Sequence, residues 1–329
     1  IALAAVYPPL GKKGGILKTE YTISYGIVCL IFFLSGISLK SKVLAKATLD
    51  WKIHLITQTI SLGITPLVGF GIGKLLLLSP NFDVNLAAGL VVACATPTTI
   101  SSNVLMTKMC GGNEAAALVN AVIGNIIGVF ISPSLIVSYV SSITPTTKYG
   151  EFNYRGIFLS LTITVIIPLF VGQIVQFLMP NFISKVQKKL PLAKINSSML
   201  LILVWGVFCD TFSSDIIKTI NITSLISIIF LNLFLFLLFS SVSFIISRIK
   251  YFHFEKRDSV AIVMCGATKT VALGIPMINI IFGQSSAVGI LSIPLLIYHA
   301  EQLVIGQGFV HYFDSWIKKD EQVELDEII

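Results

Sequence analysis

The chain has 329 residues, of which 55% are hydrophobic and only 12% are charged, and its mean hydropathy is +0.89. A soluble domain carries about 25% charged residues, so this chain cannot cover a surface that faces water. The net charge of +7 is spread over short clusters between apolar runs, which excludes a basic face for nucleic acid. The five cysteines lie in or beside apolar runs without a CxxC pair. They predict buried side chains rather than disulfides or a zinc site.

Apolar runs long enough to cross a membrane follow one another along the whole chain. A spanning helix needs about 20 apolar residues, and long runs without alternation favour helices over barrel strands. Residues 1–6 resemble the end of a first, truncated span. Nine fuller spans are predicted near residues 22–39, 53–78, 84–108, 114–140, 154–178, 196–212, 220–247, 258–282 and 285–313. The predicted fold class is therefore an all-α polytopic membrane protein with ten transmembrane helices.

The basic residues give the orientation of these spans. Of the 23 basic residues, fifteen fall on one side of the membrane, mostly in the loops at 40–52, 185–194 and 248–257. Seven fall on the other side, and Lys269 lies inside a span. The richer side is cytoplasmic by the positive-inside rule. Both termini are then cytoplasmic, and residues 314–329 form a cytoplasmic acidic tail.

The fourth and ninth spans are interrupted by polar residues. The fourth reads AAGLVVACATPTTISSNVLMTKM and is polar from Thr96 to Asn103, where Pro97 removes a backbone donor. The ninth reads VAIVMCGATKTVALGIPMINIIFG and carries Lys269 in its middle. At about 1.5 Å of rise per residue, both interruptions lie near the centre of a hydrocarbon core of about 30 Å.

The two interrupted spans also correspond to each other in position. Aligning Cys94 with Cys265 pairs Thr99 with Thr270, as two halves of five spans each would require. An odd number of spans per half forces opposite orientations, and paired broken helices in inverted halves indicate a secondary-transporter site. One kinked helix alone would mean little, because proline and glycine are common in membrane helices. The candidate solute- or ion-binding residues are Thr98, Thr99, Ser102, Asn103, Asn120, Asn125, Thr268, Lys269, Thr270 and Glu301.

Lys269 is the most informative of these residues, because an ionisable group inside a membrane usually faces a cavity or a partner. Its ammonium could stand in for a sodium ion, bind an anionic substrate, or release its proton during transport, and a helix-crossing lock is the structural alternative. Glu301 could pair with Lys269 or with His299 in the tenth span. For the other residues, satisfying released backbone groups is as good an explanation as ligand contact. Asn120 and Asn125 could line the cavity or bridge helices.

Several long motifs resemble the bile acid:sodium symporter superfamily, and more closely its SBF-like branch, which includes member seven of solute carrier family ten and fungal regulators of calcium homeostasis. The motifs are Pro97 and GGNEAAALVNAVIGNIIGVFISP, then FCDTFS, TKTVALGIPM and SIPLLIYH. The resemblance implies two inverted repeats of five helices, with helices 4 and 9 crossing at their breaks. It also implies a panel domain at 1–39 and 154–212 and a core domain at 53–140 and 220–313.

The sequence departs from the sodium-coupled members of that superfamily at their ion ligands. Those carriers place a glutamate and a glutamine in the ninth-span break, where this chain has Thr268, Lys269 and Thr270. Hydroxyl ligands of their fifth span fall on Ala117 and Ala121. The Ser102–Asn103 pair of the fourth span does match. These departures argue against sodium coupling, and no other cofactor is expected.

Two functional hypotheses follow. The first is a carrier that moves a small solute or ion by alternating access at the helix 4/9 crossover and acts as a negative regulator of cytosolic calcium uptake. The second is a non-transporting regulator of a calcium channel, and a sodium-coupled organic anion symporter is a further alternative. An enzyme is not expected, since HExxH, GxSxG and P-loop motifs are absent from the sequence. The partners implied are the lipid bilayer, a calcium channel and a second copy in a homodimer. The plasma membrane is the expected location, with the Golgi or endoplasmic reticulum as the alternative.

Overall fold

The computed structural model describes residues 2–38, 50–144, 153–213, 221–283, 285 and 287–328, and every regular element in these ranges is a helix. Eight helical segments there are long and apolar enough to cross a membrane, and Val84–Ala95 is a shorter apolar helix. The prediction of an all-α polytopic membrane protein is confirmed. The basic loop residues 40–49 lie outside the described residues.

The first half of the chain closely follows the predicted spans. Its elements are α1 (Ala2–Val6), η1 (Pro8–Leu10), α2 (Thr19–Tyr21), η2 (Thr22–Ile27), α3 (Val28–Ser38), α5 (Trp51–Gln58), η3 (Thr59–Ile64), α6 (Thr65–Leu76), α7 (Val84–Ala95), α8 (Ser101–Met109) and α9 (Glu114–Ile143). Elements η2 and η3 are single π turns inside otherwise α-helical spans. Such turns interrupt the regular hydrogen-bond ladder and occur frequently at functional sites.

The second half adds one helix that hydropathy did not predict. Its elements are α11 (Tyr154–Leu161), η4 (Thr162–Ile166), α12 (Ile167–Leu178), α13 (Pro180–Lys189), α14 (Leu192–Ser213), α15 (Ile222–Ser247), η6 (Lys250–Phe252), α16 (Lys256–Ala267), α17 (Val271–Phe282) and α18 (Val288–Ile328). Helix α13 was missed because it is short and rich in lysine. It begins at Pro180, a residue that is common at the first position of a helix. Helix α18 runs on through the predicted acidic tail as far as Ile328.

Side-chain caps fix where several helices start. The carboxylate of Asp83 accepts hydrogen bonds from the backbone N–H groups of Asn85 and Leu86 and caps α7. Asn113 caps α9 in the same way through the N–H of Ala116. Such caps satisfy donors that the first helical turn leaves free. Glu114 lies in the first turn of α9, where an acidic side chain is favourable, and forms an ion pair with Lys108 at 3.2 Å.

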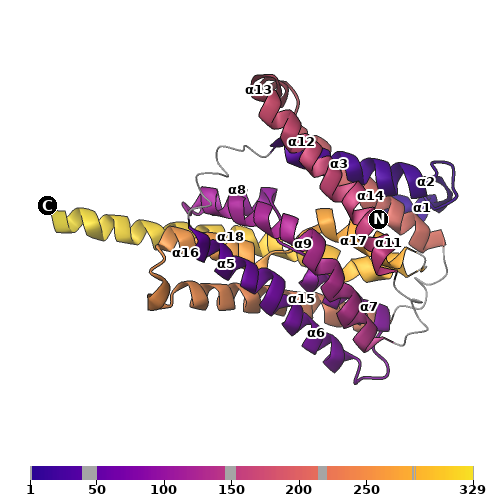
Figure 1. Cartoon of the computed structure of the whole chain (residues 1–329). Coiled ribbons are helices and arrows are strands. Elements are labelled where there is room, and N and C mark those ends of the chain that lie inside the picture. Colours follow the sequence, from indigo (N-terminus) through magenta and orange to yellow (C-terminus); the bar gives the residue numbers. More distant parts are fainter. Residues whose placement is uncertain are drawn as a thin grey trace.

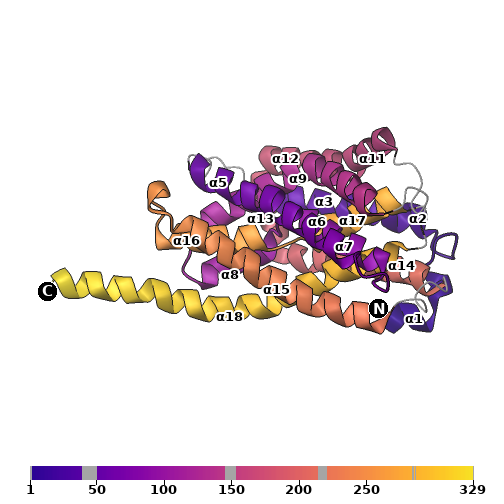
Figure 2. The same cartoon turned by 90° about the horizontal axis from the view of Figure 1, so that it is seen from below.

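The helices pack in two groups. Helix α3 packs on α12 and α14, whereas α7 packs on α6 and α18, and α15 packs on α16 and α18. In Figure 1 the first group lies along the upper side of the bundle, and α5, α6 and α15 lie along the lower side. Figure 2 shows α18 extending well beyond the other helices at the C-terminal end. The division into a panel and a core domain remains a prediction.

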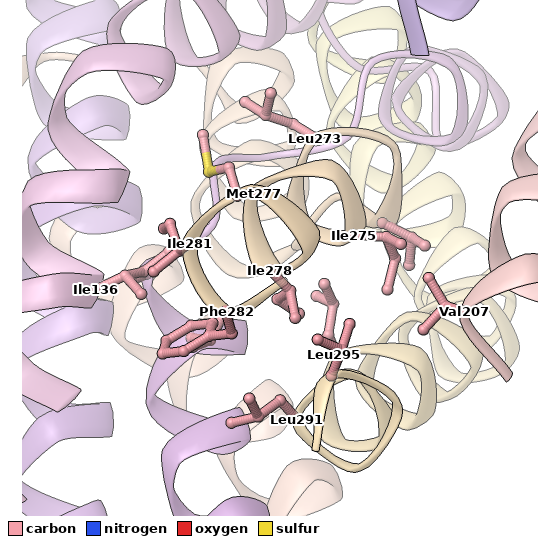
Figure 3. Close-up of a cluster of buried hydrophobic side chains, with 14 of the residues drawn as sticks. Ile136, Val207, Leu273, Ile275, Met277, Ile278, Ile281, Phe282, Leu291 and Leu295 are labelled. Carbon is pink, nitrogen blue, oxygen red and sulfur yellow. The ribbon is translucent and has the colours of Figure 1, made fainter. Parts of the chain in front are cut away.

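The α16–α17 span is the centre of the molecule. In its most apolar window 94% of the residues are buried, against 56% at most in any other candidate span of the described residues. Figure 3 shows why: Ile278, Ile281 and Phe282 of α17 face Ile136 of α9 and Leu291 of α18. Burial on this scale fixes the position of the interruption between α16 and α17.

Candidate functional site

The two interrupted helices break where the sequence turns polar. Helix α7 ends at Ala95 and α8 begins at Ser101, with Thr96 in an extended conformation before Pro97. Helix α16 ends at Ala267 and α17 begins at Val271, with Thr268 and Thr270 extended. Pro97 explains the first break, since it lacks an N–H and disfavours helix at the preceding residue. The proline of the ninth span, Pro276, lies inside α17 rather than in the break.

The two breaks contact each other directly. The N–H of Thr270 donates to the carbonyl of Pro97 at 2.8 Å, and the hydroxyls of Thr98 and Thr268 lie 2.8 Å apart. Gly274 makes this approach possible, because a Cβ at that position would lie 2.8 Å from Cγ2 of Thr96. Two segments 170 residues apart in the sequence therefore exchange the hydrogen bonds that their helices lack.

A buried polar cluster fills the crossing point. The hydroxyl of Thr268 donates to Oδ1 of Asn103 at 2.9 Å and to the carbonyl of Met264 at 2.8 Å as alternatives. The amide of Asn103 donates to the hydroxyl of Thr98. Thr98 and Asn103 are fully buried. The three predicted site residues Thr98, Asn103 and Thr268 therefore satisfy one another's hydrogen bonds inside the protein.

Lys269 is fully buried, and its ammonium lies between the third span and the end of α7 at the first break. It donates to the carbonyl of Ser61 at 2.8 Å, the hydroxyl of Thr65 at 2.6 Å and the carbonyl of Thr96 at 2.9 Å. A lysine ammonium has three donors, so all three are used. All three acceptors are neutral oxygens. Ser61 and Thr65 were not predicted as site residues.

Helix α18 holds the Lys269 peptide from the other side. The amide oxygen of Gln302 accepts from the N–H of Lys269 at 2.7 Å, and its NH2 group donates to the Lys269 carbonyl at 2.9 Å. The hydroxyl of Tyr298 donates to the carbonyl of Ala267 at 2.6 Å. His299 lies beside them, with Nδ1 2.6 Å from Nε2 of Gln302. Tyr298 and Gln302 were missed, although their four-residue spacing in an apolar span places them on one helix face.

The expected pairing of Glu301 with Lys269 or His299 is wrong. Lys269 donates instead to three neutral oxygens, and His299 contacts Gln302 and the Lys269 carbonyl. Glu301 is half-buried, and one of its carboxylate oxygens has no hydrogen-bond partner. It precedes Gln302 by one position, which turns it by about 100° around α18, away from the face that meets the break.

Two neighbouring cavities lie between the first break and the α3–α12–α14 group. The inner cavity is about 80 Å³, and among its lining residues are Thr99, Ser101, Asn125 and Thr270. The second cavity, about 390 Å³, shares Ser101 and extends to Lys108 and Glu114. Its far end therefore lies on the side that the charge pattern predicts to be cytoplasmic.

The other predicted residues are divided between cavity and interior. Asn125 donates to the carbonyl of Thr98 at 2.9 Å while lining the inner cavity. Ser102 donates to the hydroxyl of Thr99 at 3.0 Å. Asn120 lines neither cavity; it is fully buried and its side chain contacts His54 at 3.1 Å. Of the two alternatives for these asparagines, Asn125 lines the inner cavity and also bridges to the first break, whereas Asn120 only bridges helices.

Replacing Gln302 by leucine should destabilise the protein, since it leaves the N–H of Lys269 buried without a partner and leaves its carbonyl only the contact with His299 Nδ1 at 3.1 Å. Each unsatisfied buried group costs about 1–3 kcal/mol. The expected result is a lower midpoint of thermal unfolding in detergent. Gln307→Leu, at an exposed position of the same helix, is the matched control. Equal midpoints for the two variants would contradict the role given to Gln302.

Comparison with known proteins agrees with this architecture. The sequence profile of the SBF-like CPA transporter family matches residues 1–315. The chain is 37% identical to sodium/bile acid cotransporter 7 of Xenopus tropicalis over 96% of this chain and 90% of that protein. It is 36% identical to the Mus musculus protein of the same name over 96% and 90% of the two chains. It is 31% identical to solute carrier RCH1 of Candida albicans over 99% and 89%. The chain belongs to the SBF-like CPA transporter family.

Proposed function

We propose that the protein is a carrier that moves a small solute or ion by alternating access at the crossed breaks. One observation carries the proposal: the cavity at the first break is lined from both helix groups. Thr99, Asn125 and Thr270 line one wall, and Phe32 and Leu169 line the other. A cavity at a seam between two groups of helices is where rocking of one group against the other would expose a solute to either side.

The lining indicates the kind of solute. The inner cavity is surrounded by hydroxyl and amide groups together with apolar side chains, and charged groups enter only at the mouth, as Lys108 and Glu114. Because the walls present neutral donors and acceptors, they suit a small polar solute or an ion that exchanges water for protein oxygens.

The physiological role we propose is negative regulation of cytosolic calcium uptake at the plasma membrane. It is supported by the resemblance to the fungal regulators of calcium homeostasis and by the similarity to the C. albicans solute carrier RCH1. A non-transporting regulator of a calcium channel is the alternative within this role. The names of the vertebrate relatives favour a second candidate, a sodium-coupled organic anion symporter.

Blocking the cavity tests the transport proposal. Ser101 is exposed and lines both cavities, so a cysteine there should be reached by a methanethiosulfonate reagent from the cytosolic side. Cys29 is replaced by alanine first, because it is partly exposed whereas the other four cysteines are buried. In this background we expect labelled Ser101→Cys to lose control of calcium uptake in cells lacking the native protein. Reduction should restore that control.

Ser184→Cys, at an exposed position of α13 outside both cavities, is the control and should keep its activity when labelled. Unchanged activity of labelled Ser101→Cys would refute the cavity as the solute path. A separate experiment distinguishes a carrier from a channel regulator. The purified protein in liposomes is tested for calcium and sodium fluxes, which only a carrier should produce.

A further inference from the structure

The three oxygens around the Lys269 ammonium have the composition of a site for a small monovalent cation. They come from three different segments: η3, the start of α6, and the end of α7. We propose that they are such a site, that the chain fills it permanently with its own ammonium, and that the protein therefore does not bind sodium there. The cation site itself is argued from the geometry alone. Its consequence, that transport is not coupled to sodium at this position, rests on the proposed function.

The backbone explains why the Ser61 carbonyl is available. In η3 the N–H of Thr65 bonds to the carbonyl of Ile60, five residues earlier. The next N–H in this π pattern would serve Ser61, but it belongs to Pro66, which has none. The Ser61 carbonyl is therefore left to side-chain donors, which are the Thr65 hydroxyl at 2.8 Å and the Lys269 ammonium.

The broken fourth span supplies the third oxygen. Thr96 is the C-terminal cap of α7, so its carbonyl is not used by a continuing helix. The partial negative charge at a helix C-terminus favours a cation. Half-helix C-terminal ends and unwound carbonyls are the groups that hold coupling ions in transporters with broken helices.

The donor set does not fit a sodium ion beside the ammonium. All three ligands are neutral, and no carboxylate of the described residues forms an ion pair with Lys269. A second positive charge at this buried position would meet the first without any negative charge to offset it. Sodium and the ammonium are therefore alternatives for the same three oxygens.

The geometry also argues against the alternative that the Lys269 ammonium binds an anionic substrate. Lys269 lines neither of the two cavities at the break, and its three donors are all used. Gln302 fixes the Lys269 peptide on the α18 side, so the side chain extends from there to the oxygens on the α6 side. The ammonium is thus held in the site before any solute binds.

The test uses the purified full chain carrying Lys269→Ala. Its thermal unfolding is compared in the chlorides of methylammonium, sodium and the bulky cation N-methylglucamine at equal ionic strength. We expect the midpoint of Lys269→Ala to rise by a few degrees, saturably, with methylammonium or sodium, because a ligand bound only by the folded state stabilises it. The wild-type midpoint should be the same in all three salts.

Lys269→Met is the matched control, because its side chain keeps the stem that fills the site but has no charge. It should be destabilised and show no response to small cations. A simple helix lock, without a cation site, predicts that Lys269→Ala is equally destabilised in every salt, and that result would overturn the proposal. If the variant is recovered only from membranes extracted in methylammonium, the proposal is supported; recovery in none of the salts counts against it.

The stability test of Lys269→Ala and the blocking test at Ser101 can fail independently of each other. Cation-dependent stability of Lys269→Ala tests the oxygen site alone, whereas blocking at Ser101 tests the solute path. A positive result in the first experiment with a negative result in the second would keep the cation site and reject the carrier. The reverse result would keep the carrier and reject the cation site.

Discussion

Replacing Lys269 by methionine should abolish control of cytosolic calcium uptake in cells that lack the native protein, while the variant still reaches the membrane. The substitution removes three buried, charge-assisted hydrogen bonds that join the ninth span to the third and fourth. Hydrogen bonds to a charged group contribute about 1.5–3 kcal/mol each. The loss of even one would change a conformational equilibrium about tenfold or more, and calcium uptake should rise to the level of cells without the protein.

The measurement is the rate of calcium entry at matched surface expression. Lys74→Met is the control, because Lys74 is an exposed lysine near the end of α6, and it should behave as the wild type. Thr98→Ala provides a second variant, since it removes the hydroxyl that joins Asn103 to Thr268. If calcium control survives both Lys269→Met and Thr98→Ala, the crossover is not the working site.

A strain without the candidate calcium channel separates the two forms of the hypothesis. A carrier should still lower calcium entry through the remaining routes, because its action does not depend on that channel. A regulator of the channel should have no effect there. The same strain carrying Lys269→Met shows whether the residual effect depends on the crossover.

The positions of the breaks could be predicted from the sequence because their causes are local. Pro97 and the polar run after it end α7, and Lys269 marks the second break by its charge alone. The spans themselves are predictable from hydropathy, since a membrane requires long apolar helices. Helix α13 escaped the same reasoning because it is too short and too basic to resemble a span.

The partners of Lys269 could not be predicted from the sequence. Ser61 and Thr65 lie in an ordinary apolar run. Pro66 leaves the Ser61 carbonyl without a backbone donor, but nothing in that run indicates that Lys269, 208 residues further along the chain, donates to it. The opposite charges of Lys269 and Glu301 suggested a pair, but helix phase places Glu301 on another face. Gln302, one residue further on, is the side chain that reaches the break.

Substituting Gly36 by leucine should unfold the protein or prevent its expression. Gly36 of α3 and Gly172 of α12 meet where these helices cross, and their Cα atoms take the place that side chains would need. A Cβ at Gly36 would lie 2.3 Å from the Leu169 carbonyl, and a Cβ at Gly172 would lie 2.3 Å from the Phe33 carbonyl. These neighbours are backbone atoms and cannot rotate away. Small residues at such crossings let membrane helices approach closely.

The expected cost of Gly36→Leu is about 3 kcal/mol or more, at or beyond the upper end of overpacking, because relief requires α3 and α12 to separate. Gly71→Leu is the matched control: it lies in the interior of α6, and a Cβ there meets nothing within 4 Å. The two variants make the same chemical change inside apolar helices, so fluorescence-detected size-exclusion chromatography of detergent extracts compares them directly. Gly71→Leu should elute as a single peak at the wild-type level, and Gly36→Leu should aggregate or be lost. A normal peak for Gly36→Leu would mean that α3 and α12 do not cross at these glycines.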